Sequence, residues 1–286
     1  MYVVIRLKQV ILWVSVSMAF FLLCWTGTSF VSSDSAQEDG VFLPVLMYHH
    51  VQKDAKAQGK FVIAPGELEQ DLQYLQNNGY TAVVIQDLVD YVYHGTALPE
   101  KPVMITIDDG YLSVKEYIFP LLEKYQMRAV LSVIGKYSDQ YTNMPDRNVA
   151  YAHLTWDDVR ELSESGVFDI ENHTYDMHKN AQGRKGSMKK SGESAEEYRK
   201  NLQEDLSKVS TLVEQSTGRK PVCYTYPFGF FSKESKEVVK EMGFLASLSC
   251  NEGGNYITRD PECLYLIKRY NRPHGKSAEE ILKQMK

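Results

Sequence analysis

Short apolar runs alternate with amphipathic segments along most of the chain. Leu68, Leu72 and Leu75 recur at helical spacing, which is typical of a helix with one buried face. Between such patterns, the apolar runs predict buried strands at 44–48, 81–85, 103–107, 129–134, 167–170, 222–226, 244–248 and 264–268. Capping boxes, in which a Ser or Thr precedes an acidic residue by three positions, predict helices that begin after Thr155, Ser194 and Ser277.

This order of elements indicates an α/β fold with seven or eight mainly parallel strands. At this chain length a closed (β/α) barrel is the first expectation, and a doubly wound open sheet is the alternative. No glycine-rich dinucleotide or phosphate loop follows any of the expected strands, which removes the commonest reason for the open sheet. We therefore expect a single domain at 41–286.

The first 30 residues do not share this alternation. Arg6 and Lys8 precede an apolar stretch whose centre runs from Val10 to Trp25. Its length just suffices to cross a bilayer, as in a signal anchor or a signal peptide. Because no small-x-small cleavage site follows, we favour an uncleaved anchor at 1–30 and a polar linker at 31–40. The charges on either side of the stretch predict that the domain lies outside the cytoplasm, membrane-anchored, or secreted if the segment is cleaved.

The net charge of -5 and the pI near 5.9 argue against a nucleic-acid-binding protein, which would carry a basic surplus. Cys24 falls in the apolar stretch, which leaves Cys223, Cys250 and Cys263 for the domain. One disulfide, between Cys250 and Cys263, and three free thiols are both compatible with this count. The absence of any Cys-x-x-Cys argues against a thiolate zinc site. The sequence leaves the oligomeric state open.

Polar residues that can bind metals follow several of the expected strands. In parallel barrels the active site lies at the carboxyl ends of the strands, so these residues are expected to meet at one rim. The residues that end the strands are His49, Asp108 with Asp109, the segment from Glu171 to His178, Pro227 with Phe228, and Arg269.

Three of these strand ends resemble the motifs of a known family. Thr106-Ile107-Asp108-Asp109-Gly110 resembles the Thr-Phe-Asp-Asp-Gly signature of the polysaccharide deacetylases, the NodB-homology domain of carbohydrate esterase family four. His173-Thr174-x-x-x-His178 resembles their histidine motif, and Tyr226-Pro227-Phe228-Gly229 their third motif. The resemblance covers positions 44–286 in the expected order. Four residues separate the two histidines, whereas three are usual in the family. This longer spacing resembles that of the branch that acts on poly-N-acetylglucosamine.

The resemblance implies a distorted (β/α) barrel and a divalent metal held by Asp109, His173 and His178. Such a metal polarises the acetamide carbonyl and lowers the pKa of a bound water. The ligand set favours Zn²⁺, while Co²⁺, Ni²⁺ or Mn²⁺ also suit it. Asp108 is then the expected general base. His49 is the expected general acid, with His274 as the alternative.

The third motif departs from the family pattern. Thr225 stands where the family has an arginine beside the base, and we expect Arg269 to supply that cation from the last strand. Phe228 stands where a tyrosine is usual, but its backbone N–H can still stabilise an oxyanion. Tyr226, Pro227 and Phe228 are the expected substrate-binding residues.

These features predict metal-dependent hydrolysis of the N-acetyl group of N-acetylglucosamine-type residues in a cell-surface or cell-wall polysaccharide. A catalytically inactive, glycan-binding relative is one alternative. A glycosidase is another, but its carboxyl groups should face each other across roughly 5–9.5 Å, whereas adjacent Asp108 and Asp109 suit one base and one ligand better. Peptidoglycan, poly-N-acetylglucosamine and chitin fragments all remain open as substrates. The basic segment 179–194 forms either a lip that guides an anionic polymer or a solvated loop.

Overall fold

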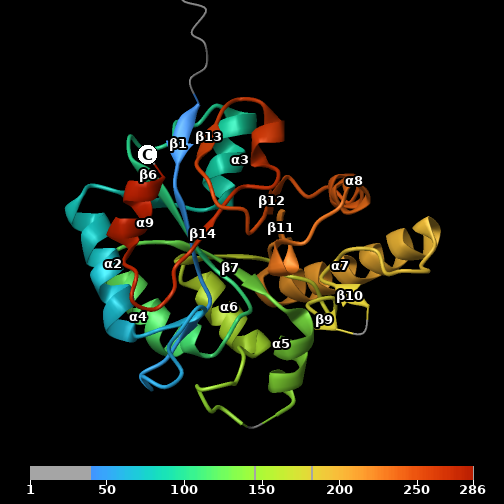
Figure 1. Ribbon diagram of the computed structural model, residues 1–286, viewed down its shortest axis with the longest axis horizontal. Coiled ribbons are helices and arrows are strands. Elements are labelled where there is room, and N and C mark those ends of the chain that lie inside the picture. Colours follow the sequence, from blue (N-terminus) through green and yellow to red (C-terminus); the bar gives the residue numbers. More distant parts are fainter. Residues whose placement is uncertain (1–39, 145, 182, 286) are drawn as a thin grey trace, which may run out of the picture. The chain divides into compact units, whose positions relative to one another are not determined.

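The computed structural model describes residues 40–144, 146–181 and 183–285. Within these residues, eight strands form one sheet in the order β12-β11-β8-β7-β6-β2-β14, with β5 also paired to β6 (Figure 1). Every pairing in this sheet is parallel, which confirms the expected α/β class. The strands are β2 Val45–Tyr48, β5 Thr81–Val83, β6 Pro102–Ile107, β7 Ala129–Val133, β8 Phe168–Asn172, β11 Cys223–Thr225, β12 Ala246–Leu248 and β14 Tyr270–Asn271.

The sheet is curled, and its two edges meet without a continuous ladder. Leu248 at the end of β12 makes a single parallel bridge to Ile267, and β14 then pairs with β2. The expected strand at 264–268 is wrong, because a 3-10 turn occupies Pro261–Leu264 and Leu266 has a left-handed φ of 58°. A residue in that conformation interrupts an extended strand. The structure therefore has a distorted, barrel-like sheet in place of the expected closed barrel.

The helices cover the sheet as the apolar patterns indicate. They are α2 Pro65–Asn77, α3 Ile85–His94, α4 Phe119–Lys124 after a π-helical turn at Val114–Ile118, α5 Gly135–Thr142, α6 Trp156–Glu164, α7 Ala195–Thr217, α8 Lys233–Glu241 and α9 Ala278–Gln284. Thr155, Ser194 and Ser277 cap α6, α7 and α9 through their hydroxyl oxygens, as expected. The sequence does not predict α5, because this segment is mostly polar and has no apolar residues that recur at helical spacing.

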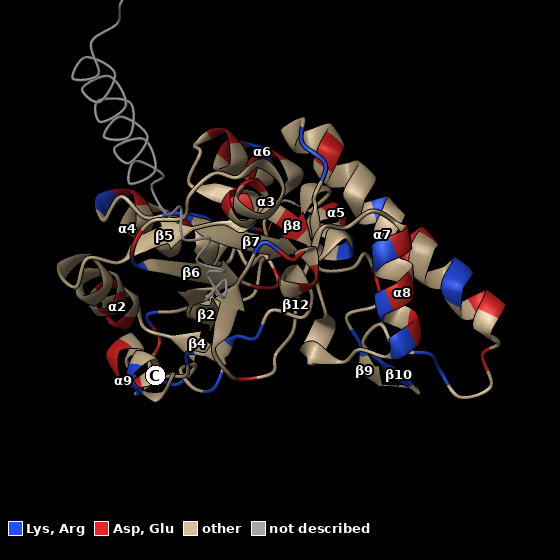
Figure 2. Ribbon diagram, turned by 90° about the horizontal axis from the view of Figure 1, so that it is seen from above, with Lys and Arg blue, Asp and Glu red and all other residues tan. Residues whose placement is uncertain are grey.

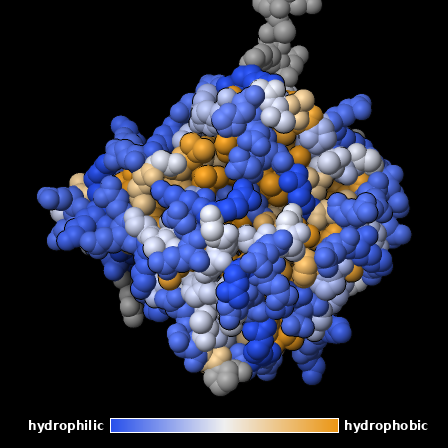
Figure 3. All heavy atoms as spheres, turned by 180° about the vertical axis from the view of Figure 1, so that it is seen from behind, coloured by the Kyte–Doolittle hydropathy of each residue, from blue (hydrophilic) through white to orange (hydrophobic). Residues whose placement is uncertain are grey.

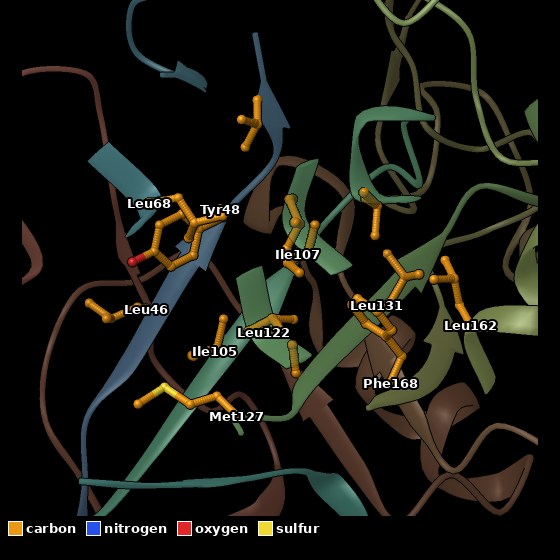
Figure 4. Packing of buried hydrophobic residues seen from close by; sticks show 14 of the residues in the cluster. Leu46, Tyr48, Leu68, Ile105, Ile107, Leu122, Met127, Leu131, Leu162 and Phe168 are labelled. Atoms are coloured by element: carbon orange, nitrogen blue, oxygen red, sulfur yellow. The ribbon is translucent and has the colours of Figure 1, made fainter. Parts of the chain in front are cut away.

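Both faces of the sheet are buried, which explains the uninterrupted apolar runs. Leu46, Ile105 and Leu131 point from neighbouring strands toward residues of the covering helices, such as Leu122 and Leu162 (Figure 4). The alternate residues of the same strands belong to a second cluster that also contains Leu248 and Ile267 from across the curl. This two-sided packing holds the carboxyl ends of the strands in fixed positions at one rim.

Three short strand pairs complete the chain. β1 Val41–Leu43 pairs with β13 Asn255–Ile257, β3 His50–Val51 with β4 Val62–Ile63, and β9 Asn180–Ala181 with β10 Arg184–Lys185. The exposed helices α7 and α8 carry charges of both signs (Figure 2), and the face seen in Figure 3 is mostly hydrophilic with small hydrophobic groups. Cys223, Cys250 and Cys263 are free thiols, so the Cys250–Cys263 disulfide is not formed.

The expected anchor at 1–30 and all but the last residue of the expected linker at 31–40 lie outside the described residues. Among the residues that are described, no helix has the length and apolar character needed to cross a bilayer.

Candidate metal centre

Three side chains that the sequence predicts as metal ligands come together at the rim of the sheet. Asp109 lies just after β6, and His173 and His178 lie in the segment that follows β8. The Asp109 Oδ1 atom lies 3.6 Å from His173 Nε2 and 3.4 Å from His178 Nε2. This oxygen is buried and has no hydrogen-bond partner. Two imidazoles around an orphaned carboxylate oxygen fit a divalent cation with open coordination positions.

A strained turn brings Asp108 and Asp109 to the same site. Side chains of consecutive strand residues point to opposite faces, so two adjacent carboxylates would normally diverge. Asp109 has a φ of 73°, and Gly110 has the same value. The left-handed conformation costs an ordinary residue about 1–2 kcal/mol, which is typical of strain kept at a functional site. A Cβ on Gly110 would also lie only 3.3 Å from the Val133 side chain.

Arg269 forms a buried, bidentate ion pair with Asp108. Its Nη1 and Nη2 atoms donate to the two carboxylate oxygens at 2.7 and 2.9 Å, and Nε donates to the Ser249 carbonyl. Burial raises the pKa of Asp108, but the Arg269 guanidinium, with His173 and His49 nearby, outweighs burial and the pKa is lowered. Asp108 is therefore a carboxylate at neutral pH. Arg269, from the C-terminal part of the chain, thus supplies the cation that the family pattern would place at position 225.

Hydrogen bonding at His173 orients the ring toward the site. Its Nδ1 atom lies 2.8 Å from the carbonyl oxygen of Thr225, so Nδ1 carries the proton and Nε2 faces Asp109 with a lone pair. Burial, followed by the proximity of His173, lowers the pKa of His178 to about 4. His178 is thus neutral in the metal-free protein. At His173 burial lowers the pKa, but the Asp109 and Asp108 carboxylates outweigh burial and raise it, so a bound cation would compete with a proton for Nε2.

His49 and His274, the two candidate acids, lie in different places. His49 follows β2 and lines the pocket, with a buried Nδ1 atom that has no partner and a ring centroid 4.8 Å from that of Phe61. Burial lowers the pKa of His49 below its ordinary value. His274 instead contacts Glu67 of α2 at 2.8 Å and is not among the residues that line the pocket. This location favours His49 over the alternative acid, because the chain turns toward α2 after β14.

The pocket at this rim has a volume of about 510 Å³. Six of the residues predicted for the site line it: His49, Asp108, Asp109, His173, His178 and Phe228. The other lining residues were not predicted for the site, and they are Met47, His50, Lys60, Phe61, Val62, Tyr111, Cys250, Glu252 and Asn271. Tyr111 follows the Asp-Asp-Gly motif directly, and that position is a signal that could have identified it. Phe61 lies in a loop with no recognisable pattern.

Only one side chain of the third motif reaches the pocket. Tyr226 is buried and packs against Tyr224 and Phe231. Pro227 is buried as well. Phe228 has a φ of 57°, is 43% exposed, and places its ring centroid 4.4 Å from that of His178. The side chains of Tyr226 and Pro227 pack into the protein and do not line the pocket, so substrate binding by these two residues stays a prediction.

The described part of the basic segment 179–194 is partly folded rather than fully solvated. Arg184 is buried and lies 3.7 Å from Glu193, while Lys179 pairs with Asp176 at 2.7 Å. A Cβ on Gly186 would lie 2.8 Å from the Pro227 carbonyl oxygen, so this segment packs closely on the third motif. Neutralising partners thus reduce the positive charge that would guide an anionic polymer.

Comparisons with known proteins agree with this site. The polysaccharide deacetylase family model matches residues 95–247, which is more than half of the chain. A poly-β-1,6-N-acetyl-D-glucosamine N-deacetylase of Escherichia coli K12 is 27% identical over 217 residues, covering 70% of this chain and 32% of that protein. The enzyme of the same name from Staphylococcus aureus MRSA252 is 22% identical, covering 81% and 83%. A de-N-acetylase structure from Aggregatibacter actinomycetemcomitans has a TM-score of 0.72 and 25% identity, covering 85% and 99%.

The chain belongs to the polysaccharide deacetylase family. This membership confirms the family that the motifs indicate. The matched range contains Asp108, Asp109, His173, His178 and Phe228 but neither His49 nor Arg269. The chain spans about a third of the length of the E. coli relative, 32%.

Proposed function

We propose that the chain removes N-acetyl groups from N-acetylglucosamine-type residues of a cell-surface polysaccharide and releases acetate. The observation that carries this proposal is the meeting of Asp109, His173 and His178 beside Asp108 in one pocket. The activity named for the E. coli and S. aureus relatives favours poly-β-1,6-N-acetylglucosamine as the polymer. Peptidoglycan and chitin fragments are the competing substrates.

A divalent cation held by Asp109, His173 and His178 would supply Lewis acidity to the acetamide carbonyl and would lower the pKa of a water molecule. We propose Zn²⁺, because two imidazoles and one carboxylate are an ordinary set for catalytic zinc; Co²⁺, Ni²⁺ and Mn²⁺ are the competing ions.

Asp108 is the proposed base, which accepts the proton of the attacking water. The Arg269 guanidinium keeps this carboxylate ionised and fixes its plane through two parallel hydrogen bonds. The base therefore needs no prior deprotonation at neutral pH. The alternative of an inactive glycan-binding protein is favoured only by Thr225, which stands where the family has an arginine. Because Arg269 makes the ion pair with Asp108 instead, this argument for inactivity is weakened.

His49 is the proposed acid, which gives a proton to the departing amine. Because burial lowers its pKa, His49 is mostly neutral in the free protein at neutral pH. We infer that His49 takes up a proton from solvent as negative charge develops on the carbonyl oxygen and stabilises the imidazolium, and that the proton held by Asp108 returns to solvent when acetate leaves. Phe61 and Phe228 expose aromatic surface beside His49 and His178, and both suit stacking on sugar rings.

The test is acetate release from acetylated oligomers of β-1,6-linked and β-1,4-linked glucosamine and from peptidoglycan. The variants are Asp109→Ala and His173→Ala, with Asp157→Ala, an exposed aspartate of α6, as the matched control. We expect the wild type and the control to release acetate, with the β-1,6-linked oligomer preferred. Both site variants and the chelator-treated wild type should be inactive. Equal turnover in all proteins, or turnover that survives chelation, would contradict the proposed function.

We further propose that the enzyme acts outside the cytoplasm and is held at the membrane by residues 1–30. The support is the sequence pattern alone, in which Arg6 and Lys8 precede the apolar stretch and acidic residues follow it. Protease digestion of intact cells should degrade the domain, and membrane fractions should retain it before but not after digestion. Full protection of the domain in intact cells would contradict this location.

A further inference from the structure

A side chain of α7 holds the loop that carries the two histidines. Between His173 and His178, the backbone N–H groups of Tyr175 and Asp176 donate to Oδ1 and Oδ2 of Asp205, at 2.7 and 2.8 Å. Asp205 lies in the middle of α7 and is half-buried. One carboxylate thus fixes two consecutive peptide groups inside the five-residue step between the metal-binding side chains.

The neighbouring contacts tie the same loop to the same helix. Asn172 accepts the N–H of Thr174 at 2.9 Å, and its amide nitrogen donates to the Leu206 carbonyl and the Ser210 hydroxyl. Thr174 has a φ of 72°, a strained conformation for a β-branched residue. Such a conformation persists only where surrounding contacts determine it, and here three successive N–H groups have side-chain acceptors.

The chemistry of the contact requires a carboxylate. Two N–H donors point at one side chain, so that side chain must offer two acceptor atoms. An ionised Asp provides them, whereas Asn provides one acceptor and turns an NH₂ donor toward the second N–H group. The position of Asp205 beside the apolar stripe of α7 places these acceptors where the helix meets the loop.

We propose that Asp205 is a positioning residue that presets the separation of His173 and His178 and so raises the affinity of the site for its metal. The proposal rests on the proposed function, which supplies the metal. A loop that is already ordered does not have to be ordered when the ion binds, and polar partners behind metal ligands typically change metal affinity by about 10–100-fold.

The test is titration of chelator-stripped protein with Zn²⁺ against a chromogenic chelator. Asp205→Asn replaces one acceptor by a donor, and Asp205→Ala removes both acceptors without facing an amide toward the loop. Glu204→Gln, an exposed neighbour on α7, is the matched control. We expect the Kd for Zn²⁺ to rise by about 10–100-fold in both Asp205 variants and to stay at the wild-type value in the control. Excess Zn²⁺ should restore acetate release.

Amide hydrogen exchange of the stripped proteins provides a second measurement. Tyr175 and Asp176 should lose protection in the Asp205 variants, while the core strands keep theirs. Wild-type affinity for Zn²⁺ in both variants, or lost activity that excess Zn²⁺ does not restore, would overturn the role of Asp205. A wild-type protein that binds no metal would instead overturn the proposed function, and the role of Asp205 with it.

Discussion

Two buried arginines three positions apart make ion pairs with aspartates, and the pairs have different surroundings. Arg269 contacts Asp108, which lines the pocket, and its other hydrogen bonds go to the Ser249 carbonyl, the Thr106 hydroxyl and the Cys250 sulfur. Arg272 contacts Asp71 of α2 at 2.7 Å, and neither residue lines the pocket.

The second pair belongs to a closed network. Asp71 also accepts from the Tyr48 hydroxyl and the Ala278 N–H, and Glu67 accepts from Arg272 and the Gly275 N–H. This network joins α2 to the C-terminal segment and α9. Asp108, in contrast, lines the pocket together with the predicted metal ligands Asp109, His173 and His178. Similar pairs can therefore have different uses: one orients a reactive carboxylate, and the other fastens the end of the chain.

The largest expected difference between the pairs is in catalysis. Asp108→Asn should lower kcat for acetate release by about 10²–10⁴-fold, because a base within reach of the attacking water typically contributes that much. Asp71→Asn, the matched change in the other pair, should leave kcat at the wild-type value in folded protein. Steady-state kinetics with saturating metal would check this. A comparable loss of kcat in both variants would mean that the pairs are not functionally distinct.

Removal of either arginine should have a similar effect on stability. Arg269→Met and Arg272→Met each leave a buried carboxylate without its cation, and breaking such pairs typically costs about 3–5 kcal/mol. The free energy of unfolding from urea titration should fall by this amount in both. Only Arg269→Met should also reduce kcat in the fraction that remains folded. An unchanged unfolding free energy in either variant would show that its pair is not stabilising.

The sequence predicts one of these pairs better than the other, for a physical reason. Asp108 is predicted by the family motif and by its place at a strand end, and Arg269 by the need for a cation beside that base, although the strand expected before Arg269 does not form. Arg272 has no such signal, because its partners lie on α2, about 200 positions earlier. Contacts of that kind depend on how helices pack against the rest of the chain, and the pattern of a single sequence does not encode this packing.

Local backbone conformation limits sequence-based prediction in the same way. The strand expected at 264–268 reads as apolar, yet Leu266 adopts a left-handed conformation and the paired strand begins only at Tyr270. Asp109 and Phe228 also have positive φ values, which turn their side chains into the site. The residue types at these positions carry no sign of the strain. The sequence nevertheless predicts the three side chains that the structure brings together, because the motif residues and their order indicate them without the backbone geometry.

The second network should give stability a dependence on acid. Glu67 is partly desolvated, which raises its pKa, but the N–H groups of Ala64 and Gly275 and the side chains of His274 and Arg272 lower it to about 2. Its contribution is present above the unfolded value near 4.5 and is lost as the pH falls toward 2. With solvent screening this amounts to about 1–3 kcal/mol. Urea unfolding between pH 5 and 3 should therefore be less pH-dependent in Glu67→Gln; an identical slope would contradict the assignment.

The smallest expected effect separates the two histidines that the sequence offers as acids. His274→Ala removes one partly exposed contact with Glu67 and should cost no more than about 1 kcal/mol of unfolding free energy, with kcat unchanged. His49→Ala should keep the fold and lower kcat by about 10²–10⁴-fold, since its ring lines the pocket. Acetate release by both variants at several pH values makes the comparison. A loss of kcat in His274→Ala would place the proton donor in the C-terminal segment, where the network around Arg272 has only a structural use.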